Sequence, residues 1–236
     1  KRSAQNAHLP ILAEKKFFKL DAKTKQYLHK MTAGFSPDNA AEIKKTETIT
    51  NHDVKAVEYF IKSALDNCKA GHLKEWVHFG LTSQDINNTA IPLLWKNSIE
   101  LEYLPAVINL QHSIGKLALA WKDVPMLART HGQPASPTRL GKEMMVFVER
   151  LENQIQLFSY IPFTAKFGGA TGNFNAHHVA YPKYNWVKFA NDFTETKLGL
   201  QRQQYTTQVE HYDTLAAHFD AIKRINNIFI DFCRDM

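Results

Sequence analysis

The chain has 236 residues, 44% of them hydrophobic, which is enough apolar material to bury a core in one large domain or two small ones. Its apolar runs are short and broken by charge, and no charged-then-apolar leader opens the chain, so we expect a soluble globular protein without a membrane partner. Two cysteines far apart in sequence, Cys68 and Cys233, favour reduced thiols in a cytoplasmic protein over a disulfide framework.

The net charge of +6 lies entirely in the first 45 residues, which hold ten Lys and Arg against four Asp and Glu. Such an excess can indicate a surface that binds nucleic acid or an anionic substrate. No basic patch is interleaved with aromatic residues, as single-stranded nucleic acid requires, so we interpret the run as a solvated helix face and expect no nucleic-acid partner.

Apolar residues recur at helical spacing along nearly the whole chain, and alternation typical of strands is almost absent. The pattern predicts an all-α protein in which strands, if any, are minor. The first clear helix follows Asn51, with Asn51 or Thr50 as its N-cap and Asp53 in its first turn. Its apolar face holds Val54, Val57, Ile61, Ala64 and Leu65.

A second helix is predicted from about Gln84 to Trp121, kinked or divided at Pro92 and Pro105. Thr82 and Asp85 have the spacing of a capping box at its start. The predicted apolar stripe consists of Leu101, Leu104, Ile108, Ile114, Leu117 and Trp121.

A third helix is predicted after Pro137, with an apolar face formed by Leu140, Met144, Phe147, Leu151, Ile155 and Phe158. A fourth begins near Asp213, and its pattern still runs at Met236 without a stop signal. Helices of this length are typical of bundles. The open pattern at Met236, and a start without Met, lead us to expect that the natural protein continues beyond this chain.

A glycine-rich stretch, Gly168–Asn173, lies between the third and fourth helices. It lacks the Gly-Lys-Ser/Thr ending of a phosphate-binding loop and follows no clear strand. We therefore expect its glycines to supply positive φ angles and close backbone approach in a turn.

Three histidines lie in polar breaks between apolar helices: His52, His78 and His131. An imidazole exchanges protons near neutral pH, and an anionic ligand rich in oxygen atoms requires hydrogen-bond donors nearby. Candidate donors close to these histidines in sequence are Asn51, Ser83, Arg129, Thr130 and Gln133. The alternative is that each histidine only occupies a loop or core position.

Two other kinds of site are disfavoured. Ser83 lacks the strand-to-helix context of a hydrolase nucleophile. The adjacent His177 and His178 cannot both face one zinc ion as residues one helical turn apart do, so we expect no metal site there.

Five segments in order resemble the fumarase/aspartase superfamily and, within it, the adenylosuccinate lyase family. They are TNHDVKAVEYF (50–60), HFGLTSQDINN (78–88), ARTHGQPASPTRLGKEM (128–144), GGATGNFNAHHVAYP (168–182) and YTTQVE (205–210). The resemblance implies a long-helix bundle fold, with residues 1–81 in an N-terminal helical domain and residues 82–236 forming the first part of the central bundle domain.

The resemblance also implies the reaction. Members of the family cleave adenylosuccinate to AMP and fumarate, and succinylaminoimidazole carboxamide ribotide to its carboxamide and fumarate, in purine biosynthesis. Both are β-eliminations, in which a base removes a proton from the succinyl Cβ and an acid protonates the departing nitrogen. No metal or redox cofactor is implied.

By the same resemblance His131 is the general acid. His52 assists it and lines the nucleotide together with Asn51 and Asp53. A separate set of positions matches substrate contacts of the family: Thr82 and Ser83 for the fumaryl carboxylate, Thr130 and Gln133 beside the acid, and Gln208.

The family's flexible loop with its Ser base is not found among these residues, nor is its N-terminal Arg-Tyr phosphate contact. The resemblance further implies a homotetramer whose active sites are shared between subunits. We therefore expect the 236 residues alone to be inactive. Another fumarate-releasing lyase, such as argininosuccinate lyase, and a non-catalytic helical oligomerisation module remain the alternatives.

Overall fold

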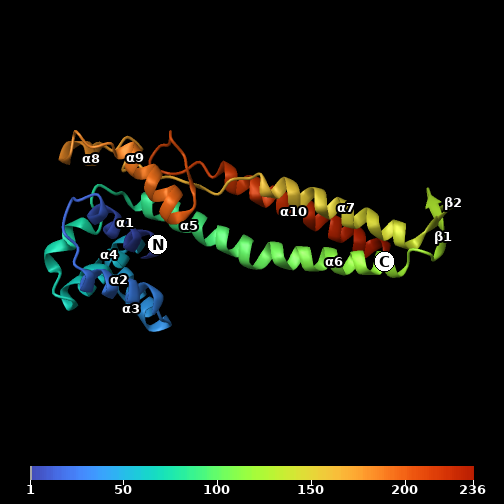
Figure 1. Ribbon diagram of the computed structural model, residues 1–236, viewed down its shortest axis with the longest axis horizontal. Coiled ribbons are helices and arrows are strands. Elements are labelled where there is room, and N and C mark those ends of the chain that lie inside the picture. Colours follow the sequence, from blue (N-terminus) through green and yellow to red (C-terminus); the bar gives the residue numbers. More distant parts are fainter. Residues whose placement is uncertain (1) are drawn as a thin grey trace. The chain divides into compact units, whose positions relative to one another are not determined.

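A computed structural model describes the backbone of residues 2–236 and the side chains of residues 8–236, and it is built mainly of helices (Figure 1). Its α-helices are α1 Arg2–Glu14, α2 Ala22–Ala33, α3 Pro37–Thr50, α4 Asp53–Asn67, α5 Ser83–Ser98, α6 Leu104–Ala120, α7 Leu140–Ser159, α8 Asn175–Ala180, α9 Trp186–Asn191 and α10 Asp213–Asp235. Shorter helical segments are η1 Gly71–Trp76, η2 Ile99–Tyr103 and η3 Asp192–Lys197, and the strands are β1 Pro125–Thr130, β2 Gln133–Arg139, β3 Thr164–Ala165 and β4 Gln201–Arg202.

The chain forms two compact units. The first unit contains residues 1–94 and 163–211, and the bundle unit contains residues 95–162 and 212–236. Residues 163–211 therefore pack with the N-terminal part of the chain although the bundle helices precede them in sequence. The domain boundary expected after residue 81 concerns the family's domains and stays a prediction.

Two apolar clusters stabilise the first unit. One joins the inner faces of α2, α3 and α4 with η1, where the predicted face of α4 is buried as expected. The other joins the end of α1 to α9, η3 and the segments around β3 and β4, with Trp186 fully buried at its centre. Because β3 and β4 pair in parallel, they tie residues 164–165 to residues 201–202 within this second cluster.

The chain before residue 51 contains three helices, α1 to α3, that the sequence analysis did not separate. α2 begins at an Asp21 cap and α3 at a capping box formed by Ser36 and Asn39. The interpretation of the basic run as a solvated face is confirmed for most of its lysines, since Lys16, Lys19, Lys23, Lys25 and Lys30 are exposed. Lys15 pairs with Asp192 at 2.9 Å, and the side chains of Lys1 and Arg2 lie outside the described residues.

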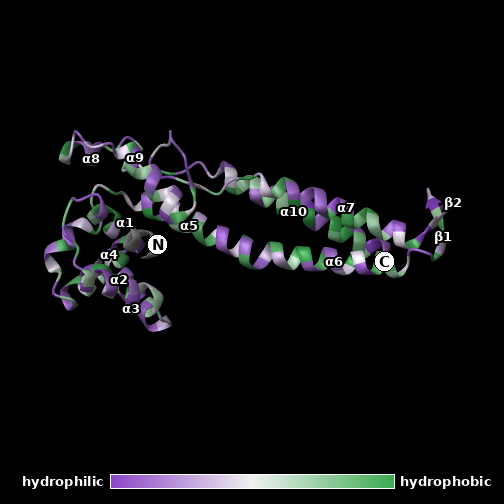
Figure 2. Cartoon of the chain, in the orientation of Figure 1, coloured by the Kyte–Doolittle hydropathy of each residue, from purple (hydrophilic) through white to green (hydrophobic). Residues whose placement is uncertain are grey.

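In the bundle unit, α6 packs against α7 and α7 packs against α10 (Figure 1). Hydrophilic and hydrophobic residues alternate along all three helices (Figure 2), as expected of helices with one buried face. The predicted face of α7 is confirmed, because Met144, Phe147, Leu151 and Phe158 are buried. No helix in the described part of the chain is both long and apolar enough to span a membrane.

The helix predicted from Gln84 to Trp121 is present as continuous helical structure from Ser83 to Ala120, through α5, η2 and α6. The five residues before Leu104 form a π-helical segment. This wider turn lies next to Pro105, whose ring lacks an N–H and clashes with the carbonyl one turn earlier in a regular helix.

The apolar stripe predicted for α6 was wrong in part. The buried face consists of Val107, Gln111, Ile114 and Ala118, whereas Leu101 remains 69% exposed and Leu117 is also exposed. α6 carries apolar residues on more than one side, so hydrophobic periodicity alone does not show which side meets α7.

Two buried histidines give the first unit a dependence on pH. His8, from α1, lies among Phe167, Phe189 and Phe193 with ring centroids 5.8 to 6.0 Å apart, and neither ring nitrogen has a partner among the described residues. Burial, reinforced by His177 and His78, lowers the pKa of His8 to about 3, and burial lowers that of His177 to about 4.

Both imidazoles are therefore neutral in the folded state, while in the unfolded chain they titrate near 6.5. The free energy of unfolding therefore has its full value above pH 6.5. It decreases as the pH falls from 6.5 toward the folded pKa values, by roughly 2 kcal/mol per histidine at pH 5. Replacing His8 by Met should remove about half of this acid loss and leave the part due to His177, without loss at pH 7.5, because no hydrogen bond is removed. Urea denaturation at both pH values measures the effect, and an unchanged acid limb in the variant would contradict it.

Candidate active site

His131 lies at the tip of a β-hairpin, where the sequence predicted only a polar break between helices. β1 and β2 pair antiparallel, with Thr130 opposite Gln133, so that His131 and Gly132 alone form the turn. Their φ angles are 50° and 73°. Positive φ at both central positions is the geometry of a type I′ turn, whose twist matches that of the flanking strands.

The turn leaves the imidazole exposed. A Cβ on Gly132 would meet nothing within 4 Å, so glycine is required there for its backbone conformation and not for space. Arg129, Thr130 and Gln133 are exposed beside His131. Three of the predicted donors therefore share one small ribbon with the predicted acid.

The base of the hairpin is fixed to the ends of α6 and α7. The backbone N–H groups of Leu140 and Gly141 donate to Val124 and Trp121, each at 3.0 Å. Gly141 allows this close approach, since a Cβ there would collide with the carbonyl oxygen of Ala118. The two long helices thus hold the ribbon in place (Figure 1).

In the first unit, His52 and Ser83 lie together. Ser83 Oγ is 3.2 Å from His52 Nε2, and the other ring nitrogen, Nδ1, accepts the backbone N–H of Lys55 at 3.2 Å. His52 is therefore the N-cap of α4, and the predicted caps were wrong. Asn51 instead ends α3 in a left-handed conformation with φ of 49°, while Thr50 is the last residue of α3. Asp53 lies in the first turn of α4 as predicted.

Asp85 holds the start of α5, where Thr82 and Ser83 lie. Its Oδ2 accepts the backbone N–H of Thr82 at 2.8 Å, which is half of the predicted capping box. Its Oδ1 accepts the Lys166 ammonium at 2.7 Å and the Gly168 N–H at 2.8 Å, and the Gly169 N–H lies 3.0 Å from Oδ2. Both charged side chains have an exposed fraction of 0%.

The glycine-rich segment therefore turns its amides inward to a carboxylate of the protein. Gly169 and Gly172 have φ of 78° and 82°, so the positive φ angles expected for this segment are confirmed. Gly172 approaches Thr206 so closely that a Cβ would collide with the Thr206 carbonyl. This contact ties the glycine segment to the loop that carries Gln208, which is exposed.

His78 differs from His52 and His131. It is partly buried, and burial lowers its pKa, so the ring is neutral at pH 7. It lies close enough to His8 to lower the pKa of that residue. We therefore interpret His78 as a packing residue of the first unit.

The candidate residues fall into two groups, each described within its own unit. Asn51, His52, Asp53, Thr82, Ser83 and Gln208 belong to the first unit, and Thr130, His131 and Gln133 belong to the bundle unit. Lys166 was not predicted from the sequence. A lysine two residues before paired glycines in an otherwise apolar stretch was the available signal, but nothing in the pattern identified Asp85 as its partner.

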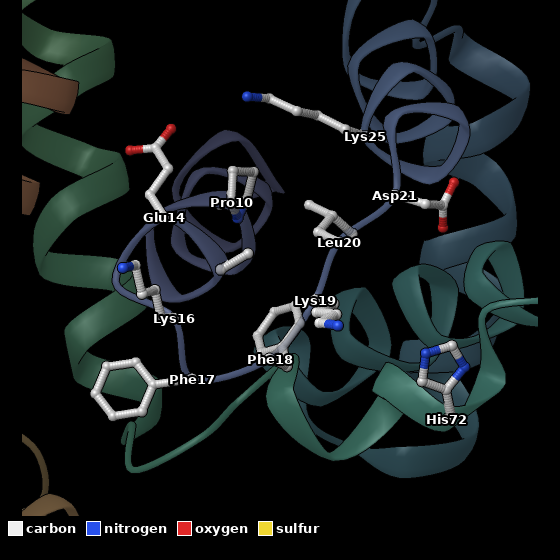
Figure 3. Close-up of a pocket in the computed structure, with 11 residues that line it drawn as sticks. Pro10, Glu14, Lys16, Phe17, Phe18, Lys19, Leu20, Asp21, Lys25 and His72 are labelled. Atoms are coloured by element: carbon white, nitrogen blue, oxygen red, sulfur yellow. The ribbon is translucent and has the colours of Figure 1, made fainter.

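A cavity of about 1080 Å³ in the first unit contains none of these residues (Figure 3). Glu14 from α1 and Lys25 from α2 face it, above the rings of Phe17 and Phe18. Two carboxylates line the cavity, and each has a partner in the protein. Glu14 pairs with Lys197 at 3.0 Å, and Asp21 caps α2. Among the residues with described side chains, no group of three or more His, Cys, Asp or Glu is placed to hold a metal ion.

Comparison with known proteins identifies the relatives of this chain. A family described as lyase matches residues 3–236. The adenylosuccinate lyase of Dictyostelium discoideum is 53% identical over 207 residues, which cover 86% of this chain and 44% of that protein. The adenylosuccinate lyase of Escherichia coli strain K12 is 44% identical over 211 residues, which cover 89% of this chain and 46% of that protein.

The chain thus spans about half the length of the curated relatives it matches, and the resemblance to adenylosuccinate lyases is confirmed. Among solved structures, a fumarate lyase from Mesorhizobium sp. BNC1 matches 99% of this chain and 52% of its own, with a TM-score of 0.79 at 18% identity. The β-carboxy-cis,cis-muconate cycloisomerase of Acinetobacter calcoaceticus matches with a TM-score of 0.75. These likenesses confirm the predicted long-helix fold.

The Asp85–Lys166 pair generates a prediction about stability. Asp85→Asn leaves the Lys166 ammonium buried without a counter-charge and should lower the free energy of unfolding by about 3 to 5 kcal/mol in urea denaturation. Adding Lys166→Met removes the uncompensated charge and should restore part of the loss. Lys44→Met, which breaks an exposed pair with Glu47, is the control and should cost less than about 1 kcal/mol. Equal effects of the Asp85 and Lys44 variants would contradict the assignment.

Proposed function

The chain belongs to the lyase family that matches residues 3–236, and on this premise we propose that its protein cleaves adenylosuccinate to AMP and fumarate. The observation that carries the proposal is the identity of 44% and 53% with proteins named adenylosuccinate lyase, spread over most of the chain. By the same resemblance we assign it a second substrate, succinylaminoimidazole carboxamide ribotide, and a place in purine biosynthesis. A cytoplasmic location stays a prediction.

The proposed reaction is a β-elimination. A base takes a proton from the succinyl Cβ, the electron pair forms the new C=C bond of fumarate, and the C–N bond breaks. The departing nitrogen is poorly basic and needs a proton in the transition state. We propose that His131 supplies it, and we assign no residue of this chain as the base.

The hairpin supports this role for His131. The exposed ring stands on a two-residue turn, so its backbone position is determined by β1 and β2 and not by a long flexible loop. Thr130 and Gln133, which pair at the turn, present polar side chains beside it. A short turn of this kind gives the acid a defined backbone position from which to reach a substrate.

The first unit supplies most of the proposed substrate contacts, and Thr130 and Gln133 of the bundle unit are proposed as the others. Thr82 and Ser83, at the start of α5, are proposed to bind the fumaryl carboxylate, and Asn51, His52 and Asp53 to line the nucleotide. Gln208 is proposed as a further contact. Hydroxyl and amide groups held in place before reaction stabilise the negative charge that develops on the carboxylate as the proton leaves.

We further propose a homotetramer in which different copies contribute to one active site. Two features support an assembly. The bundle unit exposes large apolar side chains on all three helices, among them Leu101, Leu119, Leu157, Phe219 and Ile230. A two-stranded hairpin is marginally stable by itself, so the exposed β1–β2 ribbon is expected to gain stability from a partner surface.

The role of His131 is tested by His131→Asn in the whole gene product to which these residues belong. Asn tolerates a positive φ, so the turn should survive while the acid is lost. Release of fumarate, followed by absorbance, should fall by at least about 100-fold. His112→Asn, an exposed histidine on α6, is the control and should leave turnover unchanged.

Unchanged turnover in His131→Asn would refute the proposed acid. Fumarate release from argininosuccinate and not from adenylosuccinate would instead refute the substrate. We expect the 236 residues alone to release no fumarate from either compound.

The assembly is tested by light scattering on the whole gene product. A tetramer should have four times the mass of one copy. Leu101→Lys on the bundle unit should lower the measured mass with helicity retained, whereas Ile49→Lys, at an exposed position of the first unit, should not. A single-chain mass for the unmodified protein would contradict the assembly.

A further inference from the structure

The two nitrogens of the His52 ring have different partners, and this difference determines where its proton lies. Nδ1 is 3.2 Å from the backbone N of Lys55 and accepts its N–H as the cap of α4. An amide N–H cannot act as an acceptor, so Nδ1 must carry a lone pair. In the neutral ring the single proton is therefore on Nε2.

The same assignment sets the direction of the next hydrogen bond. Nε2 lies 3.2 Å from Ser83 Oγ, and with its proton in place it donates to that oxygen. The Ser83 hydroxyl hydrogen is then free to point to a third group. A hydroxyl that already accepts one hydrogen bond is a better donor, because successive hydrogen bonds polarise one another.

We propose that His52 is a positioning residue that turns Ser83 into an oriented donor for a carboxylate oxygen of the ligand. The proposal rests on the proposed function, in which Ser83 contacts the fumaryl carboxylate. It goes further by placing the His52 proton on Nε2 and by making His52 act on the ligand through Ser83. Three hydrogen bonds act in series: the Lys55 amide donates to His52, His52 donates to Ser83, and Ser83 donates to the ligand.

Neighbouring groups hold this series of hydrogen bonds in place. The backbone N–H of Thr82 donates to the buried Asp85 carboxylate, so the residue before Ser83 is fixed at the start of α5. Asp53 Oδ1 lies 3.7 Å from His52 Nδ1. Both atoms are acceptors when the ring is neutral, so Asp53 does not compete with the Lys55 amide for Nδ1.

The arrangement excludes a hydrolase role for the same residues. A histidine that activates a serine nucleophile must accept the serine proton at the nitrogen facing it. In His52 that nitrogen already carries the proton. The spatial grouping of Ser83, His52 and Asp53 therefore differs in proton placement from a catalytic triad.

The protonation is tested without any ligand by ¹⁵N NMR of the histidine side chains in the 236-residue chain at pH 8. Nδ1 of His52 should appear as an unprotonated nitrogen and Nε2 as a protonated one. Ser83→Ala should shift the Nε2 resonance and leave Nδ1 in place, whereas Ser63→Ala, at an exposed position on α4, should shift neither. A proton on Nδ1, or an Nε2 resonance indifferent to Ser83, overturns the proposal.

Two substitutions then separate the two nitrogens. The Asn side chain places a polar atom where Nδ1 lies and is a good N-cap, so His52→Asn keeps the cap and loses the Ser83 contact. The longer Gln side chain places its NH₂ near the Nε2 position, so His52→Gln keeps a donor to Ser83 and loses the cap. The first variant therefore retains the hydrogen bond from the Lys55 amide, and the second retains the hydrogen bond to Ser83.

Fumarate is the probe for the donor role. In the whole gene product the dissociation constant for fumarate should rise about 10-fold in His52→Asn and change less than about 3-fold in His52→Gln. Ser83→Ala should raise it similarly, and the double variant Ser83→Ala with His52→Asn should show no further loss. Additive losses, or a larger loss in His52→Gln than in His52→Asn, overturn the proposal. If the unmodified protein binds no fumarate, the proposed function fails, and the NMR result alone decides the protonation of His52.

Discussion

The hydrogen bonds and the ion pair of the buried Asp85 carboxylate are the interactions on which the candidate residues at the start of α5 depend. An unpaired charge in a protein interior is too costly to persist, so this one must be met by donors wherever the chain supplies them. It receives the Lys166 ammonium and the amides of Gly168 and Gly169 from one segment and the Thr82 amide from another. Because all of these bonds end on one group, the start of α5 and the glycine segment cannot move independently.

Much of the fold follows from patterns in the sequence, and the exceptions have physical causes. The faces of α4 and α7 were predicted correctly because the apolar residues of these two helices are concentrated more strongly on one side than those of α6 are. α6 is apolar on several sides, so its buried face was assigned incorrectly. The β1–β2 hairpin was missed because its strands carry prolines and polar residues, and its only strong signal was His131-Gly132, where a histidine occupies a conformation more often taken by Asn or Asp.

The candidate residues were found by resemblance, whereas their mode of action required atomic contacts. Nothing in the spacing of Asn51, His52 and Asp53 shows that the histidine caps α4 or that one of its nitrogens faces Ser83. Likewise, Lys166 is an unremarkable lysine until its fully buried ammonium is seen on Asp85. Contacts between residues about 30 and 80 positions apart in sequence depend on how the whole chain packs, which local patterns do not encode.

Amide hydrogen exchange of Thr82, Gly168 and Gly169 tests the central claim most directly. These three groups lie at a helix start and in a loop, where amides ordinarily exchange through small local fluctuations. If their bonds to Asp85 hold the two segments together, the three amides should exchange together, as slowly as the core of α4, and all three should become fast in Asp85→Asn. Rapid exchange in the unmodified chain, at rates typical of exposed loops, would contradict the claim that this carboxylate organises the site.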